Sequence, residues 1–387
     1  MAASEELGIK GLHSFHYFVN EPERSHEFYT QKFGWSEVAR ANAEMQERTG
    51  QKSRVYQGGD VRVCVSTPLT ESCRAARYLK HHPAGIGSLS FLVEDIDKTW
   101  EVLLNREATP IHQIRETKDA SGRFRHFSIT TAIGAVAFRF IEANDWDGFA
   151  PGFEASQAES VIENEGFDFL GVDHITCNAP TMASVRLWLE HVMGMEEYWK
   201  IEFHTEDVTQ GADSGTGLRS IVMWDPRSEI KMPINEPLLP FFKEGQINKY
   251  VEDNVGAGVQ HIALGTTDVQ KAVRTFKERS VNFLETPDNY YDAAPARLAE
   301  MGVDVNNIGH KLDDLRELGI LIDGSPTDEY LIQIFLKEAA ILYDEPEAGP
   351  FFYELIQRCG DRGFGAGNFR ALFEAIERDQ VEGGEGI

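Results

Sequence analysis

The fragment Gly171-Val-Asp-His174-Ile recurs 87 residues later as Gly258-Val-Gln-His261-Ile. Two related fragments lie upstream, Gly11-Leu-His-Ser14-Phe and Gly85-Ile-Gly-Ser88-Leu. A fragment repeated at long intervals is typical of a chain built from copies of one supersecondary unit. The sequence therefore predicts four related modules, of which only the last two carry histidine at the fourth position of the fragment. A metal-binding chemistry would belong to the second half alone.

Each module is predicted to run from an apolar strand into an amphipathic helix and then into further strands. Residues 185–192 behind His174 and residues 269–276 behind His261 carry apolar side chains at i, i+3, i+4 and i+7. Short runs typical of strands also occur, such as residues 330–335. Because this order recurs four times, the sequence predicts an α+β fold of curved, mostly antiparallel sheets with helices on one face.

The domain boundary is predicted in the stretch with the weakest periodicity, between Asp147 and Asp168. We place one pair of modules in residues 1–155 and the other pair in residues 156–387. The glycines around Phe364 are interpreted as a turn that leads into a final helix over residues 368–377.

Composition excludes several classes of partner. Acidic residues outnumber basic ones 63 to 37, which gives a formal net charge of −26, and this field repels nucleic acid and anionic lipid. We find neither an apolar run long enough to cross a bilayer nor a secretory signal. The four cysteines lie far apart without a C-x-x-C pair. These features predict a cytoplasmic protein that acts on a small molecule, without nucleic-acid or membrane partners.

Two histidines at matching positions of consecutive modules meet if the modules pack about a pseudo-twofold axis. The best candidate for a third ligand is Glu354, because a carboxylate inside an apolar strand is costly to bury unless a cation compensates it. Together with His174 and His261 it would leave one side of a metal open, which is the arrangement of non-haem Fe(II) oxygenases.

Spacing alone leaves other interpretations of these residues open. A histidine on a strand is often a hydrogen-bonded core residue, and Glu354 could instead form an ion pair with Arg358. Zinc also accepts two histidines and a glutamate, so the ligand set does not identify the metal.

Local motifs are more specific than the spacing. Residues 352–377 resemble the C-terminal signature of the 4-hydroxyphenylpyruvate dioxygenase family. Further matches follow in the family's order: Pro233-Ile-Asn235-Glu-Pro, Gly256-Ala-Gly-Val-Gln260-His261-Ile-Ala, Pro287-Asp-Asn-Tyr-Tyr-Asp, Leu312-Asp-Asp-Leu and Leu331-Ile-Gln333-Ile-Phe335. The resemblance implies the vicinal oxygen chelate fold, in which each of two domains pairs βαβββ modules into an open, mostly antiparallel barrel with helices outside.

The resemblance also implies a site and a reaction. His174, His261 and Glu354 fall on the family's Fe(II) ligands. The positions that fall on its substrate pocket are Ser220, Asn235, Gln246, Gln260, Gln333, Phe335, Phe352, Phe364, Asn368 and Phe369. The implied activity converts 4-hydroxyphenylpyruvate and O2 to homogentisate and CO2 by oxidative decarboxylation, ring hydroxylation and side-chain migration, a step of tyrosine catabolism. The final helix would cover the pocket, and a dimer or tetramer is expected.

Two alternatives of function remain open at the level of sequence. A 4-hydroxymandelate synthase shares fold, metal and substrate but oxidises the benzylic carbon, and the motifs at Asn235 and at residues 367–369 favour the ring-hydroxylating enzymes. A non-catalytic protein of the same superfamily would bind small ligands without consuming oxygen, but it gives no reason for a complete set of two histidines and a glutamate.

Overall fold

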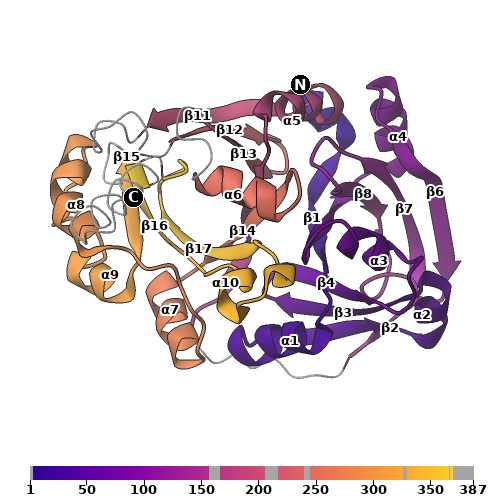
Figure 1. Ribbon diagram of the computed structural model, residues 1–387. Helices are drawn as coiled ribbons and strands as arrows, with labels where there is room; N and C mark the ends of the chain where they lie inside the picture. Colours follow the sequence, from indigo (N-terminus) through magenta and orange to yellow (C-terminus); the bar gives the residue numbers. More distant parts are fainter. Residues whose placement is uncertain are drawn as a thin grey trace.

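The computed structural model describes residues 3–156, 166–204, 217–238, 245–325, 329–365 and 367–368. In these ranges the chain forms two curled sheets with helices around them (Figure 1). Strands up to Ala155 form the first sheet, and strands from Phe169 to Cys359 form the second. The predicted division at residues 155 and 156 lies between these strands and remains a prediction.

The first half contains two modules. The first consists of β1 (Ile9–Phe18), α1 (Pro22–Glu27) with a π-helical turn (Phe28–Lys32), β2 (Ser36–Ala41), β3 (Gln51–Gly58) and β4 (Val61–Pro68). The second consists of β5 (Gly85–Val93), α4 (Ile96–Asn105), β6 (Pro110–Asp119), β7 (Gly122–Thr130) and β8 (Ala137–Glu142). A 3-10 turn (Ala3–Leu7), α2 (Ala43–Thr49), α3 (Arg74–Leu79) and β9 (Phe153–Ala155) complete this half.

The second half repeats the plan. Its first module consists of β10 (Phe169–Asn178), α5 (Met182–Trp188) with a π-helical turn (Leu189–Met193), β11 (Glu196–His204), β12 (Gly217–Trp224) and β13 (Lys231–Pro237). The other module consists of β14 (Gly258–Thr266), α7 (Val269–Glu278), β15 (Leu321–Ser325), β16 (Glu329–Phe335) and β17 (Phe352–Cys359). The additions are α6 (Gln246–Asp253), α8 (Asp288–Glu300), α9 (Leu312–Leu318), α10 (Ala339–Tyr343) and a 3-10 turn (Pro346–Ala348).

Strand pairing is the same in all four modules. The strand orders are β6-β7-β8-β5-β1-β4-β3-β2-β9 and β11-β12-β13-β10-β14-β17-β16-β15. The first and last strands of each module pair in parallel, and the other neighbours pair antiparallel. The predicted mostly antiparallel sheets built from βαβββ modules are therefore confirmed.

The helix predicted behind His261 is present as α7. The carboxylate of Asp268 accepts a hydrogen bond from the backbone N–H of Lys271 at 2.9 Å, which caps the first turn. The apolar side chains of the predicted stripe are all buried, namely Val269, Ala272, Val273 and Phe276. Asp95 caps α4 of the first half in a related way, by accepting from the N–H groups of Asp97 and Lys98. Local sequence thus defines both helix starts.

A β-bulge lies immediately before each histidine of the repeated fragment. In the pairing of β10 with β14, Asp173 is the extra residue of β10, between the paired Val172 and His174. Gln260 is the extra residue of β14, between the paired Val259 and His261. Gly171 has φ 139°, a backbone conformation that favours glycine, and Gly11 has φ 159° at the matching place in β1. A bulge inserts an extra residue and re-aims the neighbouring side chains. The repeated glycine fragment therefore marks a distorted strand, and this distortion shapes the site.

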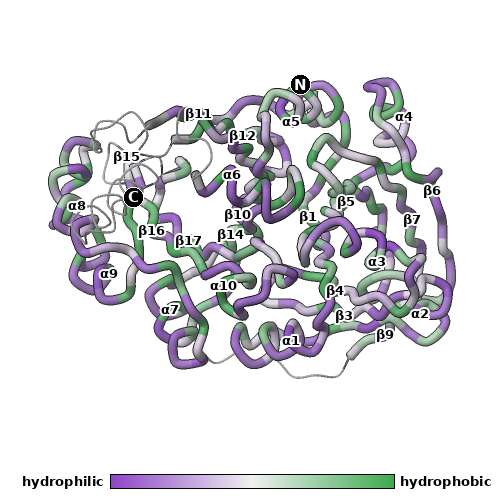
Figure 2. The backbone as a smooth tube through the Cα atoms, in the orientation of Figure 1, coloured by the Kyte–Doolittle hydropathy of each residue, from purple (hydrophilic) through white to green (hydrophobic). Residues whose placement is uncertain are grey.

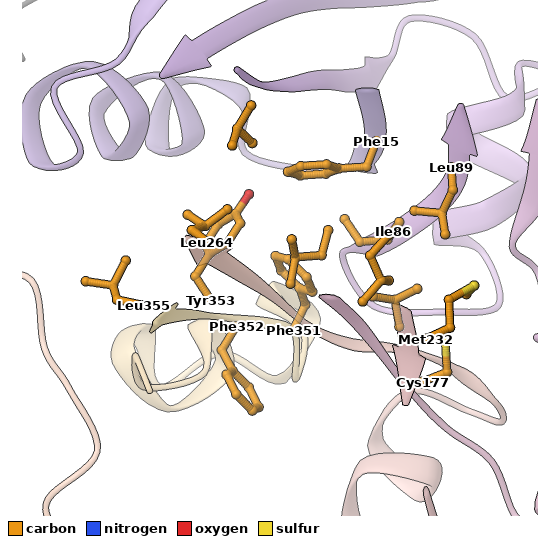
Figure 3. Packing of buried hydrophobic residues seen from close by; sticks show 14 of the residues in the cluster. Phe15, Ile86, Leu89, Cys177, Met232, Leu264, Phe351, Phe352, Tyr353 and Leu355 are labelled. Atoms are coloured by element: carbon orange, nitrogen blue, oxygen red, sulfur yellow. The ribbon is translucent and has the colours of Figure 1, made fainter. Parts of the chain in front are cut away.

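One hydrophobic core joins the two halves. Figure 2 shows the hydrophobic stretches along strands such as β16 and β17, whereas the outer helix α9 is largely hydrophilic. In Figure 3, Phe15 of the first half and Tyr353 of β17 lie on facing sides of the shared core, with ring centres 6.3 Å apart. Phe33 stacks on Phe276 with ring centres 4.9 Å apart, so side chains from both halves bury one another. No helix in the described ranges combines the length and apolar content that a bilayer crossing requires.

Candidate metal centre

Three adjacent strands of the second sheet bring the predicted ligands together. The register aligns His174 of β10 with Ala263 of β14, and Ala263 with Glu354 of β17. His261 lies two residues before Ala263 and therefore faces the same side of the sheet. One carboxylate oxygen of Glu354 lies 3.3 Å from the Nε2 atom of each histidine. All three side chains are buried, and their candidate ligand atoms lie within 4.8 Å of one another.

The hydrogen bonding of these residues fits a cation. The Nε2 atom of His261 and the Oε1 atom of Glu354 are buried without a hydrogen-bond partner, which is costly unless another group satisfies them. Burial raises the pKa of Glu354, but His174 and His261 outweigh burial and lower it. Burial likewise lowers the pKa of His174, and Glu354 and Asp173 bring it to about 9. Glu354 is thus held as a carboxylate, the form that binds a metal.

The bulge residues orient both imidazoles. Asp173 lies 2.9 Å from the Nδ1 atom of His174, and the side-chain oxygen of Gln260 lies 3.1 Å from the Nδ1 atom of His261. Such contacts leave Nε2 as the free ligand atom. Arg358 binds Asp173 through two hydrogen bonds of 2.6 and 2.7 Å. The alternative pairing of Arg358 with Glu354 is therefore wrong, because the bulge turns Asp173 toward the guanidinium.

Ala263 keeps space open between two of the ligands. It is fully buried and stands in register between His174 and Glu354. Leu331 and Ile356 pack around it as a small apolar cluster. A larger side chain at this position would extend into the space that the three ligand atoms surround. The alanine is therefore part of what allows the ligands to converge.

The predicted polar residues line two adjoining pockets. One pocket, of about 820 Å³, is bordered by His261. The predicted substrate positions that also border it are Asn235, Gln246, Gln260, Gln333, Phe335, Phe352 and Asn368. A second pocket of about 320 Å³ is bordered by His174 and Glu354, and by Ser220, Asn235, Gln333 and Phe364. Since Asn235 and Gln333 border both, the candidate metal ligands lie between the two spaces. Gln246 is exposed at the rim, whereas Ser220 is buried.

Phenylalanines surround the two histidines. The Phe352 ring stacks on His261 with centres 5.1 Å apart, and Phe335 meets the same imidazole edge-on at 5.8 Å. Phe364 lies 5.3 Å from the His174 ring. In Figure 3 the Phe352 ring points away from Tyr353, as alternation along a strand requires. The predicted position Phe369, and most of the predicted final helix, lie outside the described residues.

Asn368 is held by the inserted helix α8. Its side-chain oxygen accepts a hydrogen bond of 2.5 Å from the Tyr290 hydroxyl, and Arg297 donates to the same hydroxyl at 2.9 Å. The backbone N–H of Gly367 donates to Asp323 at 2.9 Å, and Arg297 forms an ion pair with Asp323 at 3.2 Å. The helix α8 therefore fixes the start of the segment that borders the pocket.

Several neighbours of the site were not identified from sequence. Asp173 and Arg358 orient His174, Asn178 accepts a hydrogen bond of 3.0 Å from the Asn235 amide, and Trp199 stacks on Phe364 with ring centres 6.0 Å apart. The position of Asp173 directly before His174, matched by Gln260 before His261, was the available signal. Trp199 and the pairing of Arg358 with Asp173 gave no signal, because the partners are distant in sequence.

Comparison with known proteins agrees with this architecture. The sequence model of the Glyoxalase/Bleomycin resistance protein/Dioxygenase superfamily matches residues 11–154 and 171–298. Among solved structures, a mutant of 4-hydroxymandelate synthase from Streptomyces coelicolor superimposes with a TM-score of 0.75 at 24% identity, covering 96% of this chain and 99% of that one. This structural likeness supports the fold.

Curated relatives are similar over nearly the whole chain. The 4-hydroxyphenylpyruvate dioxygenase of Caenorhabditis elegans is 34% identical over 95% of this chain and 91% of its own length. The corresponding protein of Aspergillus fumigatus is 32% identical over 98% of this chain and 94% of its own length. Likeness of this extent includes both halves and every strand of the site, and the chain belongs to the 4-hydroxyphenylpyruvate dioxygenase family.

Proposed function

We propose that the protein converts 4-hydroxyphenylpyruvate and O2 to homogentisate and CO2, as a step in tyrosine catabolism. The observation that carries the proposal is the convergence of His174, His261 and Glu354, with their ligand atoms within 4.8 Å of one another. This convergence occurs in a chain whose curated relatives are 4-hydroxyphenylpyruvate dioxygenases over more than 90% of their length.

We propose Fe(II) as the metal held by the three side chains. Two neutral imidazoles and one carboxylate leave one side of the ion free and a net positive charge in the site. Bound there, ferrous iron would supply chelation of an α-keto acid and activation of O2. The positive centre also favours an anionic substrate in a chain whose formal net charge is −26.

The other pocket residues are proposed to hold the substrate. Neutral amides at Asn235, Gln260 and Gln333 suit a ligand with a ring hydroxyl, because they bind it without the desolvation cost of a charge. Phe335 and Phe352 present apolar faces to an aromatic ring and exclude water from the reacting atoms. Ser220, Gln246, Phe364 and Asn368 complete the proposed contacts, and Phe369 is proposed to join them.

Ring hydroxylation is preferred over benzylic oxidation. The motif around Asn235 resembles the motif of ring-hydroxylating enzymes. The curated relatives at 30% identity or more are named 4-hydroxyphenylpyruvate dioxygenase. Identification of the product by mass spectrometry and NMR distinguishes the two reactions. A predominance of 4-hydroxymandelate would contradict the proposal.

We also propose a cytoplasmic location and assembly into a dimer or tetramer. All four cysteines are free, which is typical of a reducing compartment. Size-exclusion chromatography with light scattering gives the oligomeric state.

The proposal is tested by oxygen uptake with 4-hydroxyphenylpyruvate, together with metal analysis. Replacement of Glu354 by Gln should lower metal content and oxygen uptake at least about 100-fold, because it removes the anionic ligand. The exposed Glu329→Gln of β16 is the matched control and should retain uptake within about twofold. Chelation should stop uptake, and ferrous iron should restore it. Undiminished uptake in Glu354→Gln would refute the proposed ligand set.

A further inference from the structure

The first sheet contains a counterpart of the metal centre with inverted charge. Across β1, β5 and β8 the register aligns Ser14 with Ser90 and Ser90 with Arg139. The second sheet aligns His174, Ala263 and Glu354 in the same way. The register of β1 shifts just before Ser14 and just after His16, as the register of β10 does just before His174 and just after Thr176. The two sheets therefore correspond strand by strand. A cation, Arg139, thus occupies the place of the anion Glu354.

We use the name N-terminal cup for the concave face of the first sheet that carries Ser14, His16, Ser90, His126, Ser128 and Arg139. Pairing of β7 with β8 places Ser128 opposite Arg139, and His126 opposite Ile141 two residues further along. These side chains therefore share one face. His16, His126, Ser128 and Arg139 are half-buried by their exposed surface, so none of them is sealed completely in the core.

An aromatic side chain lies next to the N-terminal cup, as one does next to the candidate metal centre. The ring of Phe149 lies 5.1 Å from His13, and the ring of Phe364 lies 5.3 Å from His174. Both phenylalanines follow the last long strand of their half. His13 corresponds to Asp173, so each half has a phenylalanine beside the bulge of its first strand.

The one cation of the N-terminal cup, Arg139, lacks a counterion in the described part of the chain. The Nε atoms of Arg139 and Arg62 and the Nδ1 atom of His126 are buried without a hydrogen-bond partner. The Arg139 guanidinium lies 6.0 Å from the centre of the Phe124 ring. In the described part of the chain, no carboxylate forms an ion pair with Arg139, whereas the charge of nearby Asp60 acts on Arg62. Donors of this kind are costly to bury unless an acceptor binds them.

The charge of Arg139 reaches the histidines of the N-terminal cup. Burial, followed by the charge of Arg139, lowers the pKa of His16 to about 3 and that of His126 to about 2. The imidazoles are therefore neutral at pH 7 and can accept or donate hydrogen bonds. In a chain with 63 acidic and 37 basic residues, a largely buried arginine without an ion-pair partner is a local exception.

We propose that the N-terminal cup binds a small oxyanion, a carboxylate or a phosphate group, with the Arg139 guanidinium as its main ligand. The planar fork of arginine matches two oxygens of either group. Ser128 and Ser90, in register beside Arg139, offer hydroxyl donors, and His126 offers an imidazole. The site is separate from the metal centre, since its residues belong to the other sheet.

The test follows thermal unfolding of the metal-loaded, full-length protein as inorganic phosphate is added at constant ionic strength. Wild type should show a saturable rise of Tm. Arg139→Gln should require at least roughly tenfold more phosphate for the same rise, because a charge-assisted pair is lost. Arg125→Gln is the matched control, since Arg125 already pairs with Asp97 at 2.7 Å outside the N-terminal cup. Replacing phosphate with acetate shows whether a carboxylate suffices.

Equal phosphate dependence in wild type and Arg139→Gln, or no saturable effect in wild type, would overturn the proposal. If Arg139→Gln does not fold, imidazole resonances of wild type decide the question. Phosphate should shift the resonances of His16 and His126 saturably and leave exposed His81 unchanged. Unchanged resonances of His16 and His126 would refute binding.

Discussion

At the scale of single residues, each histidine of the candidate metal centre contacts the side chain that precedes it. Asp173 accepts from His174 and carries a bidentate contact with Arg358. Gln260 takes the corresponding place beside His261 without a charged partner. A carboxylate thus orients His174, whereas a neutral amide orients His261. We expect substitution of Asp173 to have a larger effect than substitution of Gln260.

We expect Asp173→Asn to weaken metal binding about 10- to 100-fold, because the amide orients His174 without the negative charge. Stability should fall by about 2–3 kcal/mol, since Arg358 loses its carboxylate while its side chain remains only 20% exposed. Metal titration and urea unfolding measure both effects. Asp168→Asn, at an exposed position, should change neither; an equal loss there would show that the effect is not specific to His174.

Ala263 provides a second prediction at this scale. Ala263→Val adds bulk between His174 and Glu354, and overpacking of this kind costs about 1–3 kcal/mol. Metal content should fall well below that of wild type, while circular dichroism should still show the fold. Ala263→Gly keeps the space open and should retain metal. Full metal content in the valine variant would mean that the site expands around the added methyl groups.

At the scale of elements, α8 connects the end of the described chain to the pocket. We expect Tyr290→Phe to raise KM for 4-hydroxyphenylpyruvate more than it lowers kcat, because Asn368 loses its hydrogen-bond donor. Stability should fall by about 1–2 kcal/mol, since the hydroxyl also contacts Ile322 and Arg297. Tyr291→Phe removes a hydroxyl that donates to Ile320 and does not contact Asn368, and it is the control. Similar KM values in both variants would exclude a role for Asn368 in substrate binding.

Elements differ in how far the sequence predicts them. The helix α7 and strands β10 and β14 follow from apolar periodicity and from the repeated fragment. The insertion of α8 and α9 between α7 and β15 interrupts the module plan, and its contacts with Asn368 and Asp323 depend on tertiary structure. The bulges at Asp173 and Gln260 were also missed, because a bulge alters register without altering the apolar pattern. Local signals predicted the three candidate ligands but not the contacts of Asp173 with His174 and of Arg358 with Asp173.

At the scale of the whole molecule, the two halves share one hydrophobic core. The Tyr29 and Tyr353 hydroxyls lie 2.8 Å apart across the shared core, and the rings of Phe33 and Phe276 stack. These contacts join residues more than 200 positions apart, which no periodicity in the sequence reveals. The paired modules could be predicted from repeats, whereas the continuity of their cores could not.

Acid should destabilise the molecule through the N-terminal half. Burial, followed by the charges of Arg62 and Arg139, lowers the pKa of His13 to about 3. An unfolded histidine titrates near 6.5, so between about pH 6.5 and 3 the unfolded chain binds the extra proton and the free energy of unfolding falls as pH falls. One such histidine contributes up to about 1.4 kcal/mol per pH unit.

Urea unfolding at pH 7, 6 and 5 in a buffer without oxyanions measures this dependence. His13→Gln should reduce the slope by about 1 kcal/mol per pH unit. His81→Gln, at an exposed site, should leave the slope unchanged. An unaltered slope in His13→Gln would mean that His13 is protonated in the folded protein.

The recurrence of the bulge before Ser14, as before His174, has a consequence for protein engineering. The backbone that presents a facial triad exists twice in this chain, and in the first copy only the side chains differ. Grafting histidine at 14 and 88 and glutamate at 139 would therefore call for no new loop and no change of topology. With two copies of the backbone in one chain, the side chains of the first copy can change while the second copy keeps its two histidines and its glutamate.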